Sequence, residues 1–356
     1  MSDRQQTVDD DPRFLGSPME HDGAQQPSVP APRRRRGRRI VLISLLVVAL
    51  LAGGGLIAGG IYLKSVESDI DRVDAFTGVP AQERPVAGAK GAQNLLILGS
   101  DSRDPENTAG SRTDTIIVAH LPADRSSAQL ISIPRDTWVP IPRSADGQHG
   151  GRDAKINAAF AWGGVPLMVQ TVEKFTGVRI DHVAIIDFAG FKEIIDALGG
   201  VNVDVEKSFT SIHPPHRSFQ AGPQLLDGEA ALDYSRQRKQ FADGDFARIR
   251  HQQQVIKAIL DKAASGGILA NPAKLNAFLK ATSSSVSVDK GMSLFDMGMQ
   301  MRGVRGNNLS FLTSPTKGTG RIGSESVVLA DPARVKSCYD AVRRDAVEEI
   351  KEYARK

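Results

Sequence analysis

The stretch "NLLILGSDSRDPENTAGSRTDTIIVAHL", residues 94–121, contains two short apolar runs separated by a long charged loop. Each run is dominated by Leu, Ile and Val and meets turn-forming residues at the loop, which predicts two buried strands. The loop between them is either a solvated turn or a place where charges gather around a ligand. The charged residues that decide between these readings are Asp101, Arg103, Arg112 and Asp114.

Beyond this stretch, short apolar runs continue to alternate with longer segments of helical periodicity. Strands that alternate with helices are typical of a sheet whose faces are covered by helices. The sequence therefore predicts an α/β fold of the α-β-α type, with a central mixed β-sheet covered by helices and preceded by one transmembrane helix. The predicted strands are 94–98, 115–121, 128–133, 182–187 and 201–205, and the predicted helices are 156–177, 188–200, 246–264 and 331–356.

The apolar run "IVLISLLVVALLAGGGLIAGGIYL", residues 40–63, carries no charged side chain. About 20 apolar residues span a bilayer as a helix, whereas a signal peptide has an apolar region of about 7–15 residues. A retained transmembrane helix is therefore favoured over a cleaved signal peptide. The preceding run "RRRRGRR", residues 33–39, places the N-terminus in the cytoplasm by the positive-inside rule.

This topology divides the chain into four parts and predicts a single-pass protein of the cell membrane. Residues 1–39 have few large apolar side chains and are predicted to form a disordered, basic cytoplasmic tail, followed by the span at 40–63. Residues 64–93 are predicted to form a stalk and linker, and residues 94–356 an extracytoplasmic domain with a C-terminal helical extension. Because the basic run abuts the membrane, it favours lipid headgroups over nucleic acid as its partner.

The composition excludes several classes of site. The single cysteine, Cys338, cannot form an intrachain disulfide and is expected to pack as an apolar residue in the last helix. The sequence contains no G-x-x-x-x-G-K-[ST] loop, no H-E-x-x-H and no G-x-S-x-G. An NTPase, a zinc protease of this type and an ordinary esterase are therefore not predicted.

Three further segments carry charged or amide side chains that the charged loop could meet. Taken alone, each segment has a simpler explanation as a solvated helix end, a helix cap or a surface salt bridge, and Asp245 is a possible N-cap. Taken together with the charged loop, the segments indicate a ligand site, because paired carboxylates suit Mg²⁺ and arginine forks match phosphate oxygens. The combination predicts a site for a pyrophosphate or a phosphodiester. The residues concerned are Arg135, Lys155, Arg236, Arg238, Asp245, Arg248 and Gln252.

Several motifs between residues 94 and 264 carry a family resemblance. They are "NLLILGSDSR", "GSRTDTIIV", "ISIPRDTWV", "KINAAFAWGG", "LDGEAALDYSRQRK" and "GDFARIRHQQQVI". In this order they resemble the LytR-CpsA-Psr family of cell-envelope proteins. The resemblance implies a Mg²⁺-dependent phosphotransferase that moves a glycopolymer phosphate from a polyprenyl-pyrophosphate carrier to peptidoglycan, forming a phosphodiester bond. The glycopolymer would be teichoic acid, arabinogalactan, capsule or a similar polymer.

The resemblance also assigns roles to individual residues of what it implies is a catalytic domain. The implied magnesium ligands are Asp101 and Asp114. The implied pyrophosphate contacts are Arg103, Arg112, Arg135, Lys155, Arg236, Arg238 and Arg248, with Asp245 and Gln252 orienting these cations. The implied catalytic set is Asp101, Arg112, Asp114, Arg135, Arg236 and Arg238.

Two other functions stay open at this point. The same cleft could hydrolyse polyprenyl pyrophosphate with water as the acceptor. The chain could also act as an envelope-linked transcriptional attenuator, although a folded domain outside the membrane argues against it. The group that deprotonates the acceptor is unassigned, and Asp101 is a candidate only if metal binding leaves one of its oxygens free.

Two structural expectations follow from the proposed ligand. A polyprenyl tail needs an apolar pocket, which the strand faces and the "VIKAIL" face of residues 255–260 could line, although such faces more often form plain core. Arg236 and Arg238 are two residues apart, and residues at this spacing share a face only in an extended segment. The helix that begins near Asp227 is therefore predicted to end around Tyr234, with residues 235–239 extended and Lys239 on the opposite face.

Overall fold

The computed structural model describes residues 70–101, 113–264, 271–304 and 306–354, which all belong to one compact unit of residues 59–356. The predicted tail and membrane span of residues 1–63 lie outside this part of the chain. Among the described residues, no helix is both long enough and apolar enough to cross a bilayer.

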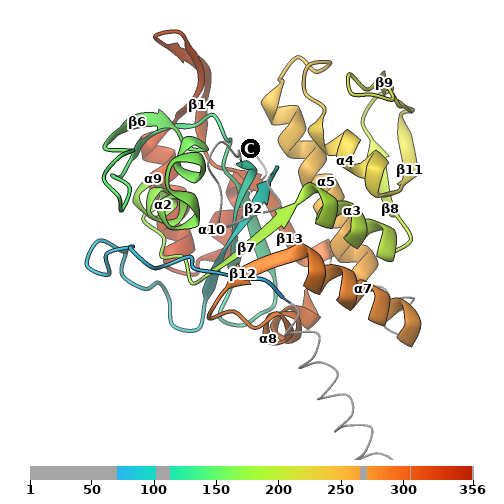
Figure 1. The fold of residues 1–356 in the computed structure, drawn as a ribbon, viewed down its shortest axis with the longest axis horizontal. Helices are drawn as coiled ribbons and strands as arrows, with labels where there is room; N and C mark the ends of the chain where they lie inside the picture. The colour runs from blue at the N-terminus through green and yellow to red at the C-terminus, as the bar shows by residue number, and fades with distance from the viewer. Residues whose placement is uncertain (1–69, 102–112, 265–270, 305, 355–356) are drawn as a thin grey trace, which may run out of the picture. The chain divides into compact units, whose positions relative to one another are not determined.

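A seven-stranded sheet forms the centre of the described part of the chain (Figure 1). Strand β2 pairs antiparallel with β3 and parallel with β7, so the sheet is mixed, as predicted. In spatial order the strands are β1 (Arg72–Val73), β12 (Val286–Asp289), β7 (His182–Asp187), β2 (Gln93–Ser100), β3 (Thr113–Leu121), β4 (Ala128–Ser132) and β13 (Leu309–Thr313).

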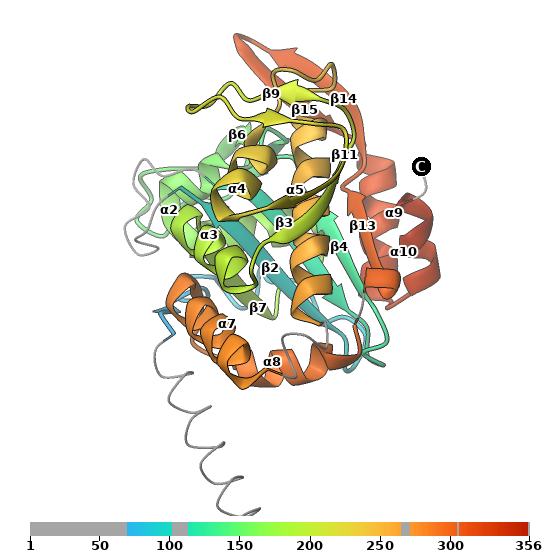
Figure 2. The same ribbon diagram turned by 90° about the vertical axis from the view of Figure 1, so that its right-hand side faces the viewer.

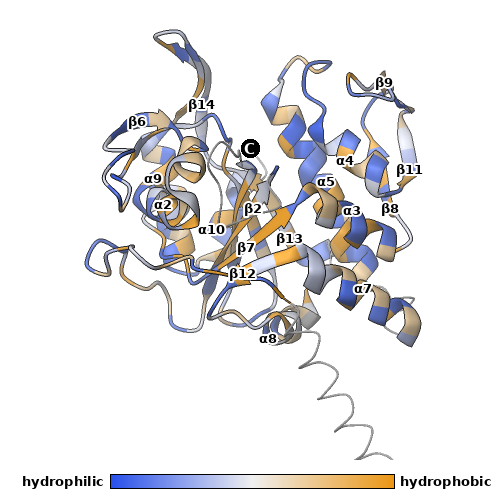
Figure 3. Ribbon diagram, viewed as in Figure 1, coloured by the Kyte–Doolittle hydropathy of each residue, from blue (hydrophilic) through white to orange (hydrophobic). Residues whose placement is uncertain are grey.

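Alternate side chains of the central strands enter two different cores. On β2, Leu96 and Leu98 pack on one face of the sheet, whereas Leu95 and Ile97 pack on the other. This follows from the period of two in a strand, where neighbouring side chains point to opposite faces. Figure 3 shows the result as strongly hydrophobic central strands such as β7, surrounded by helices of mixed hydropathy. The two strands of the opening stretch are therefore buried on both faces of the sheet.

Helices cover both faces of this sheet, which gives the α-β-α arrangement (Figures 1 and 2). One face packs against α2 (Ala158–Thr176), α9 (Pro332–Arg343) and α10 (Val347–Ala354). The other face packs against α3 (Phe188–Ala197), α5 (Asp245–Ala263), α7 (Pro272–Ser285) and α8 (Leu294–Gln300).

A smaller layer, built around α4, packs on the outer side of α3 and α5 (Figure 2). Two antiparallel strand pairs belong to it, and two other pairs lie on the side of the sheet that α2 covers (Figure 1). The first two pairs are β8 (Val201–Val205) with β11 (Gly222–Leu226) and β9 (Phe209–Thr210) with β10 (Ser218–Phe219), beside α4 (Gly228–Arg236). The other two are β5 (Trp138–Ile141) with β6 (Arg152–Lys155) and β14 (Thr316–Ile322) with β15 (Glu325–Ala330).

The segment assigned to a stalk and linker, residues 64–93, contributes to the folded unit from residue 70 onward. Its β1 extends the central sheet by pairing with β12, and Val73 and Ala75 are buried in the core under α2. The folded unit therefore includes residues before the boundary predicted at residue 94. A two-residue edge strand is too short to show a period in the sequence.

The predicted terminal helix of residues 331–356 is also interrupted. It forms α9 and α10, which are separated at Asp345, a residue with a left-handed φ of 57°. The Asp345 carboxylate binds the buried His120 Nε2 at 2.9 Å and accepts a hydrogen bond from the Ala123 amide at 3.0 Å. These contacts fix the break against the sheet. Cys338 is fully buried in α9, as expected.

A buried ion pair attaches residues before the first long strand to the core. Arg84 Nη2 lies 2.7 Å from Glu173 Oε1, and the side chains are 12% and 3% exposed. Replacing Glu173 with alanine is expected to lower the free energy of unfolding by about 3–5 kcal/mol, because the Arg84 guanidinium would stay buried without a counter-charge. Chemical denaturation of the full chain in detergent measures the loss.

The matched control is Glu229→Ala, since Glu229 also forms an ion pair with a cation, Lys192, but both side chains are solvent-accessible. Surface ion pairs contribute little to stability, so this variant should be close to the wild type. Equal losses from Glu173→Ala and Glu229→Ala would contradict the structural role of Arg84.

Candidate active site

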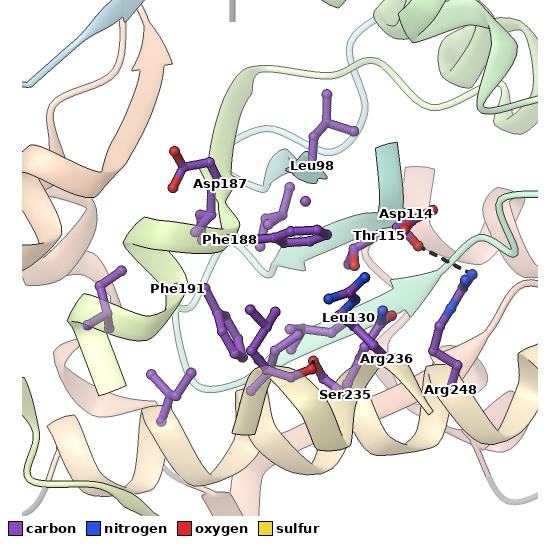
Figure 4. A pocket seen from close by; sticks show the side chains of 18 of the residues that line it. Leu98, Asp114, Thr115, Leu130, Asp187, Phe188, Phe191, Ser235, Arg236 and Arg248 are labelled. Atoms are coloured by element: carbon purple, nitrogen blue, oxygen red, sulfur yellow. Dashed lines mark hydrogen bonds between the residues drawn. The ribbon is translucent and has the colours of Figure 1, made fainter. Parts of the chain in front are cut away.

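An apolar cavity of about 520 Å³ lies between the sheet and helices α3, α4 and α5. Its size is typical of small-molecule sites. The strand residues in its wall belong mainly to the sheet face that packs against α3, α5, α7 and α8. Figure 4 shows Phe188 and Phe191 of α3 projecting into it beside Leu130 of β4. The apolar lining includes Leu95, Ile97, Leu130, Ile186, Phe188, Phe191, Ile194, Ile256, Ile259 and Leu260. The expected lining by strand faces and by residues 255–260 is therefore present.

Charged side chains lie at one end of this cavity. Strand β3 supplies Asp114, the turn after β4 supplies Arg135, and the first turns of α5 supply Arg248. Arg236 ends α4, and Arg238 follows two residues later. The structure thus brings together residues from four separate segments of the charged sequence motifs.

Arg135 is the centre of one half of this cluster. It donates a hydrogen bond to the Asp114 carboxylate, and its Nε lies 3.8 Å from Asp136 Oδ2 and 4.0 Å from Asp245 Oδ1. Burial acts to lower the pKa of Arg135, but the attraction of Asp114, Asp136 and Asp245 outweighs it and raises the pKa above its usual value. The guanidinium therefore remains a fixed cation.

Asp245 is the centre of the other half. Its Oδ1 lies 2.8 Å from Arg248 Nη2 and 4.0 Å from both Arg135 Nε and Arg238 Nη1. Burial raises the pKa of this carboxyl, and the neighbouring arginines, Arg248 foremost, only partly oppose the shift. Asp245 is the first residue of α5 rather than its N-cap, which is Gly244. A carboxylate in the first turn is still favoured by the helix dipole.

Several polar atoms in the cluster are buried without a hydrogen-bond partner among the described residues. They are Arg135 Nε, Arg248 Nε and Asp245 Oδ2, whereas Asp245 Oδ1 forms the ion pair with Arg248. Buried polar atoms in native proteins are almost always paired, so unpaired guanidinium nitrogens indicate a place for an anionic ligand. Figure 4 shows Arg248 approaching β3, where its Nη2 donates to the Asp114 carbonyl oxygen at 3.5 Å.

The segment around Arg236 and Arg238 differs from the prediction in detail. Helix α4 ends at Arg236 rather than at Tyr234, and Gln237 then adopts an extended conformation with ψ of 131°. Both arginines line the cavity, as expected, but Lys239 lines it as well, because the chain turns there instead of continuing as a strand. The placement of Lys239 on the opposite face was therefore wrong.

The remaining predicted site residues lie in different places. Gln252 lines the cavity from α5. Lys155 lies outside the cavity lining, where its Nζ is 2.8 Å from Glu325 Oε2 and 3.8 Å from Asp136 Oδ1. This ion pair lowers the pKa of Glu325. Arg103 and Arg112 lie outside the described residues.

Asp101 and Asp114, the two carboxylates expected to hold magnesium, lie at the ends of β2 and β3. Asp114 falls at the register shift between the pairs Gly99–Thr115 and Ser100–Thr113, and Asp101 directly follows Ser100. Carboxylate oxygens are ligands that suit Mg²⁺. Among the described residues, no group of three or more His, Cys, Asp or Glu could hold a metal. An ion at this point would therefore take its other oxygen ligands from phosphate and water, as Mg²⁺ commonly does.

Two aromatic residues were missed by the sequence analysis. Phe188 and Phe191 lie one helical turn apart directly after the buried strand β7. The Asp187 side chain caps this helix by accepting a hydrogen bond from the Gly190 amide at 2.6 Å. The Arg236 guanidinium lies 5.2 Å above the Phe188 ring, at the junction of the charged and apolar parts of the cavity. The sequence signal that could have found them is a pair of aromatic residues, three positions apart, directly after the end of a buried strand.

Comparison with known proteins gives consistent matches over most of the chain. The sequence model of the LytR_cpsA_psr family matches residues 64–343. The "Cell wall biosynthesis protein LcpA" of Corynebacterium glutamicum is 33% identical over 301 residues, which cover 72% of this chain and 57% of LcpA. The "Polyisoprenyl-teichoic acid--peptidoglycan teichoic acid transferase TagU" of Halalkalibacterium halodurans is 34% identical, over 76% of this chain and 91% of TagU.

Solved structures agree with these sequence matches. The Bacillus subtilis TagV structure superposes with a TM-score of 0.60 at 29% identity and covers 74% of this chain and 99% of TagV. The structure of TagT bound to LI-WTA superposes with a TM-score of 0.57 at 25% identity, over 74% of this chain and 96% of TagT. By its sequence match over residues 64–343 and by its fold, the chain belongs to the LytR_cpsA_psr family.

Proposed function

We propose that this protein is a membrane-anchored phosphotransferase that attaches a glycopolymer to peptidoglycan through a phosphodiester bond. The donor is the glycopolymer linked to a polyprenyl pyrophosphate. The observation that carries the proposal is the fixed arginine cluster at one end of an apolar cavity, because a diphosphate joined to a long hydrocarbon needs both. The names of relatives such as TagU, a teichoic acid–peptidoglycan transferase, support the same reaction class.

In this reaction the acceptor hydroxyl oxygen attacks the phosphorus that bears the glycan. The bond from that phosphorus to the bridging oxygen breaks, and polyprenyl monophosphate leaves with the electron pair. Arg135, Arg238 and Arg248 neutralise the charge that develops on the phosphate oxygens. Because these guanidinium groups are held by Asp114 and Asp245, they need little reorganisation as the charge moves. A magnesium ion on Asp101 and Asp114 would add a further fixed positive charge on the diphosphate.

The apolar cavity would hold the first part of the polyprenyl tail. Each buried methylene contributes about 0.8 kcal/mol, so even a few isoprene units give strong binding. The tail would meet the diphosphate near the Phe188 ring, which lies beneath Arg236. This arrangement would hold the reacting phosphorus at the arginine cluster.

The proposal includes the membrane location. Residues 40–63 would span the cytoplasmic membrane with the N-terminus inside, so that the domain lies outside, beside both the lipid carrier and peptidoglycan. A reporter fused after residue 356 should be active only outside the cytoplasm. Reporter activity in the cytoplasm would contradict this topology.

Transfer can be separated from hydrolysis by varying the acceptor. We expect the full chain, given lipid-linked glycopolymer and Mg²⁺, to form peptidoglycan-linked polymer when peptidoglycan fragments are present. Release of the polymer should be much slower when they are absent. If free phosphorylated polymer is released at the same rate in both cases, the protein is a hydrolase instead.

A further inference from the structure

The loop between β9 and β10 forms part of the wall of the cavity next to the arginine cluster. Ile212 and His213 of this loop line the cavity together with Arg236, Arg238 and Lys239. The motifs that resemble the family do not include this loop.

A buried polar network fixes this loop to the end of α4. The Ser211 hydroxyl donates to Asp233 Oδ1 at 2.6 Å, and the Gln237 amide donates to the same oxygen at 2.5 Å and to the Ser211 hydroxyl at 2.8 Å. All three side chains are buried. Buried, hydrogen-bonded networks of this kind hold a single conformation. The His213 amide donates to the Ser211 hydroxyl at 2.9 Å, which ties His213 directly to the network.

The network holds the loop and the end of α4 in a fixed relative position. Asp233 and Gln237 flank Arg236 in the sequence, so the same hydrogen bonds that hold the loop also hold the arginine segment. His213 and Arg236 are therefore positioned relative to each other by one rigid unit. This is the arrangement expected for two groups that act on one reacting centre.

The surroundings of His213 favour the neutral form of its ring. Burial lowers the pKa of this imidazole below its usual value of 6.5, and the positive charges of Arg236 and Lys239 and the neighbouring His216 act in the same direction. Among the charged groups that face it, Asp233 of α4 opposes the shift. The ring is only partly buried, and it forms no hydrogen bond to any described residue. A neutral imidazole with a free ring nitrogen can accept a proton at pH 7.

The carboxylates of the cluster are poorly suited to this task. The oxygens of Asp245 are buried and surrounded by arginines, so a polymer hydroxyl cannot reach them. Asp114 is bound by Arg135, which weakens it as a base. His213 combines accessibility with neutrality at the same end of the cavity.

We propose that His213 is the general base that takes the proton from the acceptor hydroxyl, a role that rests on the proposed phosphotransfer. As the acceptor oxygen bonds to the phosphorus, its proton passes to the free ring nitrogen of His213. The bond from phosphorus to the bridging oxygen breaks, and polyprenyl monophosphate leaves with that electron pair. The imidazolium then returns its proton to solvent.

The test compares His213→Gln and His213→Ala with the control His149→Gln, which changes an exposed histidine outside the cavity lining. The assay uses full chain, a short-chain polyprenyl-pyrophosphate disaccharide and peptidoglycan fragments. We expect both His213 variants to lose about 10²–10⁴-fold in kcat with little change in KM, whereas His149→Gln stays near the wild type. Added imidazole should restore part of the activity of His213→Ala, which a merely structural role would not predict.

The pH profile gives a second readout. Wild-type activity should fall as the pH drops below the pKa of His213, because the protonated ring can no longer accept a proton. This acidic limb should be absent from His213→Gln. If His213→Gln keeps the wild-type rate or keeps the same acidic limb, the inference is overturned. Because wild-type transfer is measured in the same assay, failure of the proposed function would show itself separately, as no transfer by the wild type.

Discussion

Arg135→Lys should lower the rate of glycopolymer transfer by about 10²–10³-fold, the scale seen when one preorganised charge-stabilising donor is lost. Lysine keeps the positive charge beside Asp114 and Asp245, so the fold and the local charge balance should be retained. It cannot reproduce the planar fork that bonds Asp114 while leaving the buried Nε for a phosphate oxygen. The measurement is kcat for transfer, together with the thermal unfolding midpoint.

The control for this variant is Arg143→Lys. Arg143 is exposed and donates a long hydrogen bond of 3.4 Å to the Gly147 carbonyl oxygen. The same chemical change there should leave transfer unaltered. If Arg135→Lys retains most of the wild-type rate, the arginine cluster does not stabilise the transition state in the way described.

Ile256→Trp should weaken binding of a long-chain polyprenyl phosphate by roughly 100-fold. Ile256 lines the apolar cavity from α5, so a larger ring there takes space from the tail. Excluding three or four methylene groups at about 0.8 kcal/mol each gives close to 3 kcal/mol, which is about two factors of ten. A short-chain analogue that ends before this point should bind both forms equally, because the arginine cluster is unchanged.

The neighbouring residue provides the control. Lys257 lies outside the cavity lining and forms an accessible ion pair with Asp261. Lys257→Trp therefore introduces the same side chain without filling the cavity, and carrier binding should be retained. An Ile256→Trp variant that binds long and short carriers as the wild type does would show that the cavity is not the tail site.

The central part of the fold could be predicted because its signals are local. The apolar runs on either side of the charged loop predict two buried strands, and these strands pair antiparallel from Asn94–His120 to Gly99–Thr115. Strands β12 and β13 were not predicted, although they belong to the same sheet. They are four and five residues long, and their place in the sheet depends on partners far away in the sequence. β1 was missed for the same reason.

The site shows the same division between local and long-range signals. The charges of Asp114, Arg135, Arg238 and Arg248 were expected to gather, because arginine and carboxylate at strand and helix ends suit a phosphate ligand, and the structure places them together. The partner of Lys155 could not be foreseen, since Glu325 comes from a hairpin that no sequence pattern connects with it.

The fate of the two phosphorus atoms tests the central claim most directly. A lipid-linked glycopolymer carries a different phosphorus isotope at each position of its diphosphate and is given to the full chain with peptidoglycan. We predict that the phosphorus next to the glycan appears in a phosphodiester on peptidoglycan, while the other leaves as polyprenyl monophosphate. Release of both phosphorus atoms together as polyprenyl diphosphate would mean that the sugar–oxygen bond is broken instead, and it would contradict phosphotransfer at the arginine cluster.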